Sequence, residues 1–315
     1  MIAQHIEKES AIIFDVQRFS LQDGPGIRTT VFFKGCPLRC IWCHNPESFT
    51  KQPQLIYHHH LCVNCRQCVN VCPNGAQKEK CIEEQLLHYL DWSKCNGCGK
   101  CMTVCNYDAL AVAGVEYTPG KLYDQIKGDF LYHELEGGDG KGGVTFSGGE
   151  PLQNVAFIKA FRGLAPDLHI ALETSGYAAL QQVKELAEVV DLILFDYKVT
   201  DEKKHQSLCG VSNKLILANL DYLCLNGYEV ILRLPLIPDV NDDQKHLEGI
   251  AALMKKYPQI KKAQIMPYHT LGIHKRDELG LPPQAWGERG ADEKTQQKWL
   301  AHIKKHGIKN IELSV

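Results

Sequence analysis

Several features that would place a chain in an obvious functional class are missing from these 315 residues. Lysine and arginine together number 35, against 37 aspartate and glutamate, so no basic surplus indicates nucleic-acid binding and no acidic tail indicates a disordered segment. No run of about 18 apolar residues predicts a membrane-spanning helix. Residues 1–14 have mixed charge and no long apolar stretch, unlike a signal peptide. We therefore expect a cytoplasmic protein.

Cysteine, by contrast, is plentiful, and its distribution is uneven. Twelve of the 14 cysteines lie between Cys36 and Cys105, and only Cys209 and Cys224 lie beyond. In a reducing compartment, clustered cysteines are more often metal ligands or catalytic groups than disulfides. We expect Cys209 and Cys224 to be ordinary buried thiols, since free cysteine is a common small core residue.

Short apolar segments bounded by glycine or proline alternate with helical patterns along most of the chain. The segments typical of buried parallel strands are residues 27–36, 143–149, 168–176, 190–198, 228–238 and 263–269. Apolar residues three and four apart predict helices over residues 155–164, 180–189, 215–225 and 246–256. This alternation predicts an α/β fold with a parallel sheet. Because six strands are too few for a closed eight-stranded barrel, we expect a partial (β/α)6 TIM-like barrel. Its active-site residues should lie at the C-terminal ends of the strands.

Residues 50–113 interrupt this pattern and are expected to form an inserted domain, with residues 1–49 and 114–315 forming the barrel. The insert has few apolar runs, so it needs bound metal to fold. Its cysteines follow the spacing C-x2-C-x2-C-x3-C twice, with Pro73 after the first run and Asn106 after the second. This is the pattern of bacterial ferredoxins with two [4Fe-4S] clusters, in which the fourth cysteine of each run binds the other cluster. The expected ligand sets are Cys62, Cys65, Cys68 and Cys105 for one cluster, and Cys72, Cys95, Cys98 and Cys101 for the other.

Three points in the insert stay open. A pair of zinc knuckles is the alternative to two clusters. Cys81 falls outside both runs and is interpreted as a spare thiol, with no role assigned. His58, His59 and His60 form a triplet that we interpret as a solvated surface patch, with metal binding as the alternative.

A separate cysteine motif, C-x3-C-x2-C, comprises Cys36, Cys40 and Cys43 directly after the first predicted strand. Three thiolates can bind three irons of a [4Fe-4S] cluster and leave the fourth iron open, whereas simple electron-transfer clusters use four cysteines. An open coordination position on a metal site usually indicates chemistry. The motif therefore predicts a catalytic cluster; a zinc site or unrelated thiols is the alternative.

This motif, with the aromatic Trp42 at its last variable position, resembles the signature of the radical S-adenosylmethionine (SAM) superfamily. The resemblance implies that SAM chelates the open iron through its amino and carboxylate groups. Trp42 would then lie near the adenine, the alternative being a core aromatic. Gly148, Gly149 and Glu150 look like the GGE motif that contacts the SAM amino group. Glycines allow close approach of the backbone, and a carboxylate accepts a charge-assisted hydrogen bond.

Other strand ends carry further resemblances to pyruvate formate-lyase activating enzymes. These imply that Glu173, Thr174 and Asp196 hold a monovalent cation near SAM, although the family has aspartate where this chain has Glu173. Lys198 is a suitable cation for the SAM carboxylate. His246 matches a ribose-contacting histidine, with a helix-surface histidine as the alternative.

The flanking segments narrow the resemblance to glycyl radical enzyme activating enzymes. Residues 14–48, which include the DGPGIR stretch of Asp23 to Arg28, closely resemble their N-terminal signature, and Pro267 to Lys275 resembles a later segment. The family's activity implies reductive cleavage of SAM to methionine and a 5′-deoxyadenosyl radical, which abstracts a hydrogen atom from a glycine of a partner glycyl radical enzyme. Flavodoxin or ferredoxin would be the reductant.

The insert separates subgroups of this family. Activators of the choline lyase, glycerol dehydratase, hydroxyproline dehydratase, isethionate lyase and arylacetate decarboxylase types carry such inserts, whereas the pyruvate formate-lyase activator does not. A partner other than pyruvate formate-lyase is therefore expected. One alternative is a radical SAM enzyme with auxiliary clusters that modifies a peptide or small molecule. A non-enzymatic electron carrier is another. The insert's position between the first two predicted strands favours the activating enzyme.

Overall fold

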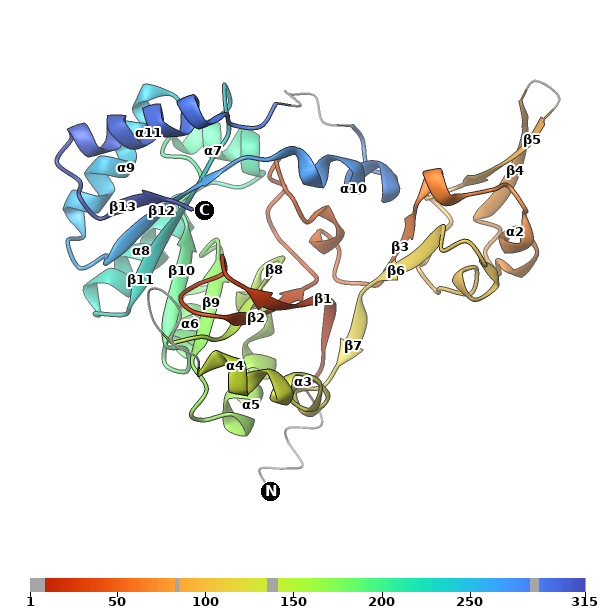
Figure 1. Ribbon diagram of the computed structural model, residues 1–315, viewed down its shortest axis with the longest axis horizontal. Coiled ribbons are helices and arrows are strands. Elements are labelled where there is room, and N and C mark those ends of the chain that lie inside the picture. Colours follow the sequence, from red (N-terminus) through yellow and green to blue (C-terminus); the bar gives the residue numbers. More distant parts are fainter. Residues whose placement is uncertain (1–8, 83–84, 135–140, 284–288, 315) are drawn as a thin grey trace.

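In the described part of the chain, the protein is built around one sheet of nine strands (Figure 1). The computed structural model describes residues 9–82, 85–134, 141–283 and 289–314. In spatial order the strands are β13 (Ile311–Leu313), β12 (Lys262–Pro267), β11 (Val230–Leu236), β10 (Leu192–Asp196), β9 (Ile170–Thr174), β8 (Gly143–Gly148), β2 (Arg28–Phe33), β1 (Ala11–Ser20) and β7 (Val115–Tyr117).

The six predicted strands are confirmed, and they lie side by side in chain order from β2 to β12, all parallel. Their continuous apolar runs fit burial on both faces. In β8 the first five residues are buried, and the Phe146 ring lies 5.6 Å from that of Phe33 on β2 and 5.3 Å from that of Phe161 on a covering helix.

Three strands extend this sheet beyond the prediction. β13 adds a seventh parallel strand beside β12, while β1 and β7 pair antiparallel at the opposite edge. β7 and β13 have only three residues each, too short for a periodic signal. β1 breaks its register with β2 at two places, so its burial does not alternate as a regular strand's would.

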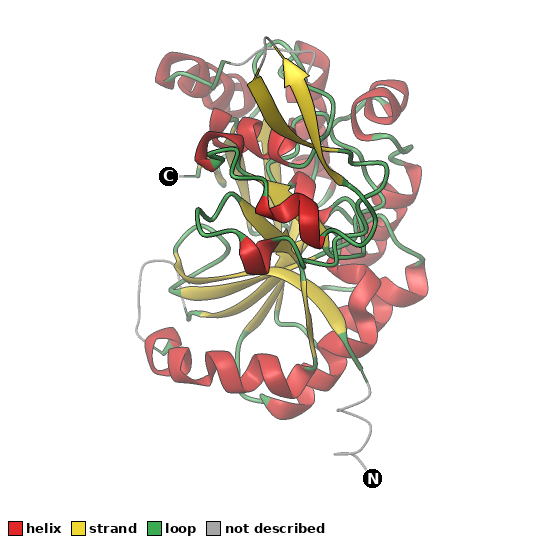
Figure 2. Ribbon diagram, turned by 90° about the vertical axis from the view of Figure 1, so that its right-hand side faces the viewer, coloured by secondary structure: helices red, strands yellow, loops and turns green. Residues whose placement is uncertain are grey.

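In the view of Figure 2, helices lie above, below and to the right of the sheet. The four predicted helices are confirmed as α5 (Val155–Leu164), α6 (Leu180–Ala187), α8 (Lys214–Leu225) and α9 (Gln244–Lys256). The main body also contains α3 (Pro119–Ile126), α4 (Phe130–His133), α7 (Glu202–Cys209), α10 (Ile273–Glu278) and α11 (Glu293–Lys305). Aspartate side chains cap the N-termini of α7, α9 and α11 by accepting a backbone hydrogen bond. None of the helices in the described ranges is long and apolar enough to span a membrane.

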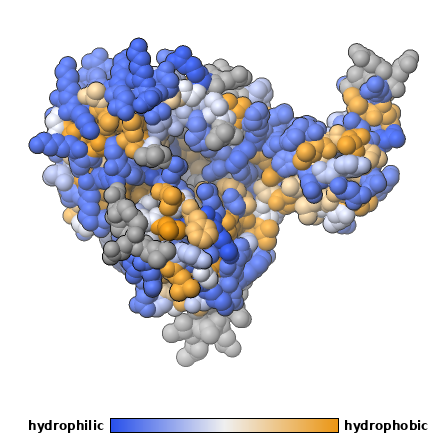
Figure 3. All heavy atoms as spheres, viewed as in Figure 1, coloured by the Kyte–Doolittle hydropathy of each residue, from blue (hydrophilic) through white to orange (hydrophobic). Residues whose placement is uncertain are grey.

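The cysteine-rich segment forms a lobe that projects from the main body (Figures 1 and 3). Its base is the antiparallel pair β3 (Gln54–Tyr57) and β6 (Leu110–Ala113). Beyond the base lie α2 (Gln67–Val71) and a hairpin of β4 (Gln77–Ile82) and β5 (Gln85–Leu90). Its small core combines apolar side chains with buried cysteines: Leu55, Tyr57, Cys68, Ala76, Leu90, Cys101 and Leu110.

Candidate active site

The loop that carries Cys36, Cys40 and Cys43 follows β2 at the C-terminal end of the parallel strands. Gly35 turns the chain with a φ of +94°, a conformation that favours glycine. The loop is anchored to the end of α7, because the backbone N–H groups of Arg39 and Ile41 donate to the carbonyls of Cys209 and Leu208 at 2.8 and 3.0 Å. Cys40 is buried, and Cys36 and Cys43 are half-buried. The structure thus brings the three predicted cluster cysteines together in one packed loop.

Burial raises the pKa of Cys36 above its ordinary value and that of Cys43 to about 12, whereas the hydrogen bond with Cys209 lowers the pKa of Cys40. A metal ion must therefore displace the protons when it binds, as in other thiolate sites.

Cys209 is buried as expected, but it lies beside the cysteine loop rather than in the general core. Its thiol shares a hydrogen bond with Cys40, and this contact together with burial raises the pKa of Cys209. Cys209 therefore stays a protonated thiol directly beside a predicted ligand. The sequence contains no signal for this contact, because 169 residues separate the two positions. Cys224 is also buried.

An apolar shell surrounds the cysteine loop. Trp42 is buried in it, with 5% of its surface exposed. The ring of His44 stacks on those of Tyr268 and His269, at centroid distances of 5.1 and 4.2 Å. The following helix α10 supplies Lys275, whose Nζ donates to Glu47 Oε1 at 2.6 Å. The two family-like segments, which are far apart in the sequence, thus meet at the cysteine loop.

The GGE segment at the end of β8 lies against the start of the same loop. A Cβ atom on Gly148 would come within 2.3 Å of the Phe33 backbone nitrogen, and one on Gly149 within 2.3 Å of the Gly35 carbonyl oxygen. Only glycine permits these approaches. Glycine at both positions therefore brings the β8 end against the loop that carries Cys36.

Glu150 is entirely buried and fully engaged with the protein. Its carboxylate accepts hydrogen bonds from the hydroxyls of Thr174 and Ser175, both at 2.5 Å, and from the backbone N–H groups of Ser175 and Leu152. Burial raises the pKa of Glu150, while these bonds favour the ionised form. The structure thus gives Glu150 a role in joining β8 to β9. Its predicted contact with the SAM amino group stays a prediction.

Glu173 belongs to a second polar group among the strands. It accepts a hydrogen bond from Ser147 at 2.6 Å and lies 3.4 Å from the buried guanidinium of Arg233. Arg233 also lies 3.8 Å from Asp23 of the DGPGIR stretch. Burial raises the pKa of Glu173, and the carboxylates of Asp23 and Asp196 raise it further. Two carboxylates, those of Glu173 and Asp23, therefore share one cation, Arg233, which sequence reasoning missed.

The three predicted cation ligands, Glu173, Thr174 and Asp196, have different surroundings. Asp196 is close enough to Glu173 to affect its pKa. The hydroxyl of Thr174, however, donates to Glu150 and accepts from the backbone of Gly176. The cation site stays a prediction, and the Thr174 hydroxyl is already engaged within the protein.

Lys198 lies beside the cysteine loop at the end of β10. Its Nζ contacts Asp196 Oδ2 at 2.7 Å. Although burial opposes its charge, the neighbouring Asp196 and Cys40 raise the pKa of Lys198. The lysine is therefore a permanent cation next to the predicted cluster ligands, and its contact with the SAM carboxylate stays a prediction.

His246 is not a helix-surface residue, which settles one alternative. It is 2% exposed, and its Nδ1 accepts a hydrogen bond from the backbone N–H of Thr200 at 3.1 Å. Burial lowers its pKa to about 4, so the ring is neutral at physiological pH. Its Nε2 has no hydrogen-bond partner in the described part of the chain. The ribose contact stays a prediction.

In the projecting lobe, the eight cysteines gather as the crossed pattern predicts. One small cavity is lined by Cys62, Cys65, Cys68 and Cys105, and another by Cys72, Cys95, Cys98 and Cys101. Among the described residues, no three of these cysteines bring their sulfur atoms within 4.8 Å of one another. Cys81 is exposed on β4, outside both cavities.

The lobe contacts the main body near the cysteine loop. His58 Nδ1 lies 2.8 Å from Glu278 Oε1 on α10, the helix whose Lys275 bonds to the loop. His59 and His60 are exposed. The triplet is thus a surface patch in part, with His58 in an inter-lobe contact. α10 links the two cysteine-rich regions.

Comparison with known proteins agrees with this architecture. A family model described as the radical SAM superfamily matches residues 105–249, and one described as a 4Fe-4S dicluster domain matches residues 61–110. The chain is 38% identical over 305 residues to the choline trimethylamine-lyase activating enzyme of Oleidesulfovibrio alaskensis, covering 95% of this chain and 96% of the relative.

Two further relatives are also named as activating enzymes. The trans-4-hydroxy-L-proline dehydratase activating enzyme of Clostridioides difficile is 39% identical over 85% of this chain and 87% of its own. The indoleacetate decarboxylase activating enzyme of Tractidigestivibacter scatoligenes is 35% identical over 96% of this chain and 98% of its own.

The parallel sheet, the cysteine loop at its strand ends and the dicluster lobe define a radical SAM iron–sulfur protein. Within that superfamily, the chain belongs to the glycyl radical enzyme activating enzymes. It is thus an oxidoreductase that uses SAM and iron–sulfur clusters and acts on a glycyl radical enzyme. The electron-carrier alternative does not account for these relatives.

Proposed function

We propose that this activating enzyme holds three [4Fe-4S] clusters and acts on a glycyl radical enzyme other than pyruvate formate-lyase. The two crossed cysteine sets of the lobe are the observation that carries the proposal. They are separate from the loop of Cys36, Cys40 and Cys43, so each of the three places offers its own thiolate set. The insert supports a partner of the lyase, dehydratase or decarboxylase kind.

The cysteine loop fits a cluster with one open iron. Its three thiols lie on one short loop, whereas Cys209, which contacts Cys40, belongs to helix α7 outside the C-x3-C-x2-C motif. The parallel strands β2 and β8–β12 form the partial (β/α)6 barrel of this proposal, with the loop at their C-terminal ends. When bound, the cluster and SAM supply a reductive cleavage that gives methionine and a 5′-deoxyadenosyl radical.

The residues around the loop would position SAM. Lys198 provides a fixed positive charge for the carboxylate, and the Gly148–Gly149 backbone approaches the loop closely enough to meet the amino group, with Glu150 behind it. Trp42 lies in the apolar shell that would receive the adenine, and His246 offers Nε2 to the ribose. Glu173 and Asp196 supply the carboxylates for a monovalent cation. Thr174, the residue after Glu173, completes the predicted set.

The lobe would deliver electrons. Its contact with α10, which also bonds to the cysteine loop, supports a route from the lobe to the catalytic loop. A flavodoxin or ferredoxin would be the donor, and the thiol-rich sites favour the reducing cytoplasm as the location.

Iron analysis tests the cluster count. Anaerobically reconstituted protein should contain about twelve irons, four per cluster. Replacing Cys36, Cys40 and Cys43 together with alanine should remove about four irons and abolish SAM cleavage. Four irons in the wild-type protein, or cleavage by the triple variant, would contradict the proposal.

Electron paramagnetic resonance tests the partner. The protein, SAM and a reductant are mixed anaerobically with each glycyl radical enzyme of the source organism. A glycyl doublet should appear on a partner of the choline lyase, isethionate lyase, dehydratase or arylacetate decarboxylase type and vanish when the partner's loop glycine becomes alanine. A radical on pyruvate formate-lyase alone would overturn the partner class. SAM cleavage without a radical on any such enzyme would favour the peptide- or small-molecule-modifying alternative.

A further inference from the structure

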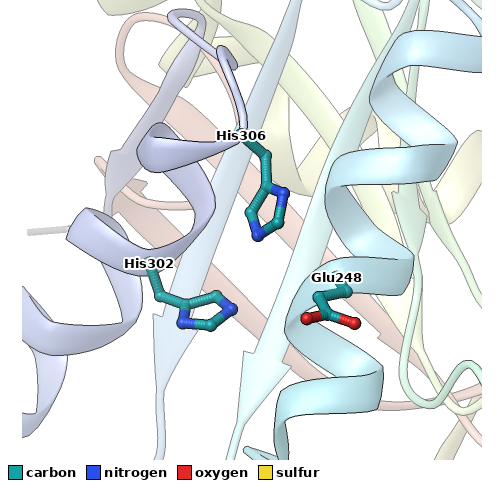
Figure 4. A group of neighbouring side chains, drawn as sticks. All are labelled: Glu248, His302 and His306. Carbon is teal, nitrogen blue, oxygen red and sulfur yellow. The ribbon is translucent and has the colours of Figure 1, made fainter.

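A group of potential metal ligands lies between two outer helices, apart from every cysteine site. Glu248 is in the first half of α9, His302 is in the last turn of α11, and His306 directly follows that helix (Figure 4). We propose that these three side chains bind one divalent transition-metal ion of the zinc class. Neither SAM chemistry nor the cluster assignments depend on this site.

The three side chains already converge. One donor atom from each lies within 4.8 Å of the other two, and no other group of histidine, cysteine or acidic side chains in the described ranges does so with three or more members. Ligands around one zinc ion lie within about 4 Å of each other, given metal–ligand bonds of about 2.0–2.1 Å. Because the Glu248 side chain is exposed, a small rotation of its carboxylate can shorten the distances between donor atoms from 4.8 Å to those around a zinc ion.

The unsatisfied hydrogen-bonding capacity of His302 points to a missing partner. Its Nε2 is buried and contacts no donor or acceptor in the part of the chain that is described. Such a nitrogen costs free energy unless something binds it. Across from it, Glu248 accepts one hydrogen bond, from Gln244 one turn earlier at 2.7 Å. A carboxylate has about four acceptor positions, so capacity for a metal remains.

The local chemistry selects the kind of metal. His302 and His306 are four residues apart, so they lie on one helix face, and their ring centroids are 5.4 Å apart. Two imidazoles and one carboxylate suit zinc and nickel, whereas magnesium and calcium prefer oxygen ligands alone. The end of α11 also presents backbone carbonyls, which favour a cation. Exposure of Glu248 leaves room for water in the fourth position.

The ion would join two helices that already pack together. Trp299 of α11 donates its ring N–H to Asp242, just before α9, at 3.0 Å. α11 leads into β13 at the edge of the sheet. Bound metal would therefore hold the outer helical layer against this edge, and amide hydrogen exchange in both helices should slow.

Zinc titration of the cluster-loaded protein under anaerobic conditions tests the site. Calorimetry should show one Zn²⁺ per chain, with no matching binding of Mg²⁺. X-ray absorption at the zinc edge should give only nitrogen and oxygen neighbours at about 2.0–2.1 Å, rather than sulfur at about 2.3 Å. The iron content should not change. Sulfur neighbours or iron loss would place the zinc at a cysteine site and overturn the proposal.

Variants locate the ion. His302→Ala, His306→Ala and Glu248→Gln should each weaken zinc binding by at least about tenfold, the scale seen when a metal site loses even an outer-shell partner. His60→Ala and His274→Ala remove exposed histidines elsewhere and should leave binding unchanged. Because His306 lies beyond the end of α11, its variant should keep the fold, which circular dichroism checks. Unchanged affinity in His306→Ala, loss in either control variant, or no binding tighter than about 100 μM would each refute the site.

Discussion

Thr174, the last residue of β9, donates its hydroxyl hydrogen to the carboxylate of Glu150 at 2.5 Å and so ties β9 to the segment that follows β8. Both side chains are buried, and the Gly148–Gly149 backbone that precedes Glu150 lies against the cysteine loop. The geometry of the expected SAM site thus depends on a hydrogen-bonded carboxylate inside the protein.

Glu150→Ala should therefore weaken SAM binding by at least about tenfold, since a hydrogen bond to a charged group contributes about 1.5–3 kcal/mol. Anaerobic calorimetry with cluster-loaded protein measures this. Thr174→Val is the matched variant, because it removes one hydrogen bond and keeps the carboxylate. It should cost stability with a smaller loss of SAM affinity. Equal SAM affinity in Glu150→Ala and the wild-type protein would refute the role.

Lys198→Ala should also weaken SAM binding by at least about tenfold, because the SAM carboxylate would lose its fixed positive charge. Equilibrium dialysis with labelled SAM measures the change. Lys214→Ala, which removes a lysine side chain that is 78% exposed, should have no effect. If Lys198→Ala bound SAM normally, the lysine would serve only its ion pair with Asp196.

Cys209→Ala should retain the iron of the catalytic loop and SAM cleavage, because Cys209 lies on α7, outside the three-cysteine loop, and contacts Cys40 through a hydrogen bond. Loss of its hydrogen bond to a ligand sulfur should instead shift the reduction potential of that cluster. Iron analysis and a redox titration followed by electron paramagnetic resonance distinguish these effects. Loss of about four irons would make Cys209 a ligand.

Cys98→Ala should show whether SAM cleavage depends on the lobe clusters. Cys98 lines one lobe cavity and lies outside the strands that carry the cysteine loop. The variant should bind SAM and cleave it with a strong artificial reductant, yet activate its partner poorly with flavodoxin or ferredoxin. Cys81→Ala, which changes an exposed cysteine of the same lobe, is the control. Full activation by Cys98→Ala would make the lobe clusters structural.

The free energy of unfolding should fall in mild acid because His133 is buried without charge. Burial lowers its pKa from an ordinary 6.5 to about 4, and the charge of Arg28 adds to this. Below pH 6.5 the unfolded chain binds a proton that the folded protein excludes, so stability falls as the pH drops from 6.5 towards 4. One such group contributes at most about 1.4 kcal/mol per pH unit.

Denaturant unfolding at a series of pH values measures this slope. His133→Gln should have a shallower slope than the wild-type protein between pH 6.5 and 4.5. His274→Gln, which changes an exposed histidine on α10, should retain the wild-type slope. Identical slopes in His133→Gln and wild type would assign the acid sensitivity to other groups.

The amino-acid sequence alone determined the features that depend on short intervals along the chain. Six buried strands were predictable from short continuous apolar runs bounded by glycine or proline, and four helices from apolar residues three and four apart. The two cysteine groups of the lobe were predicted from the repeated C-x2-C-x2-C-x3-C spacing and the ferredoxin pattern that it matches. Their binding of iron stays a prediction. Short strands such as β7 and β13 carry too few residues for such a period, so the sequence did not reveal them.

Only the tertiary structure decided which distant side chains meet. Cys209 contacts Cys40 because α7 ends beside the cysteine loop, and Arg233 meets Asp23 because the DGPGIR stretch lies against β11. Glu150 is buried against β9 rather than open at a strand end, and His246 is buried although it belongs to an outer helix. Such contacts follow from how strands and helices pack in three dimensions, and sequence periodicity contains no information about that packing between segments far apart in the chain.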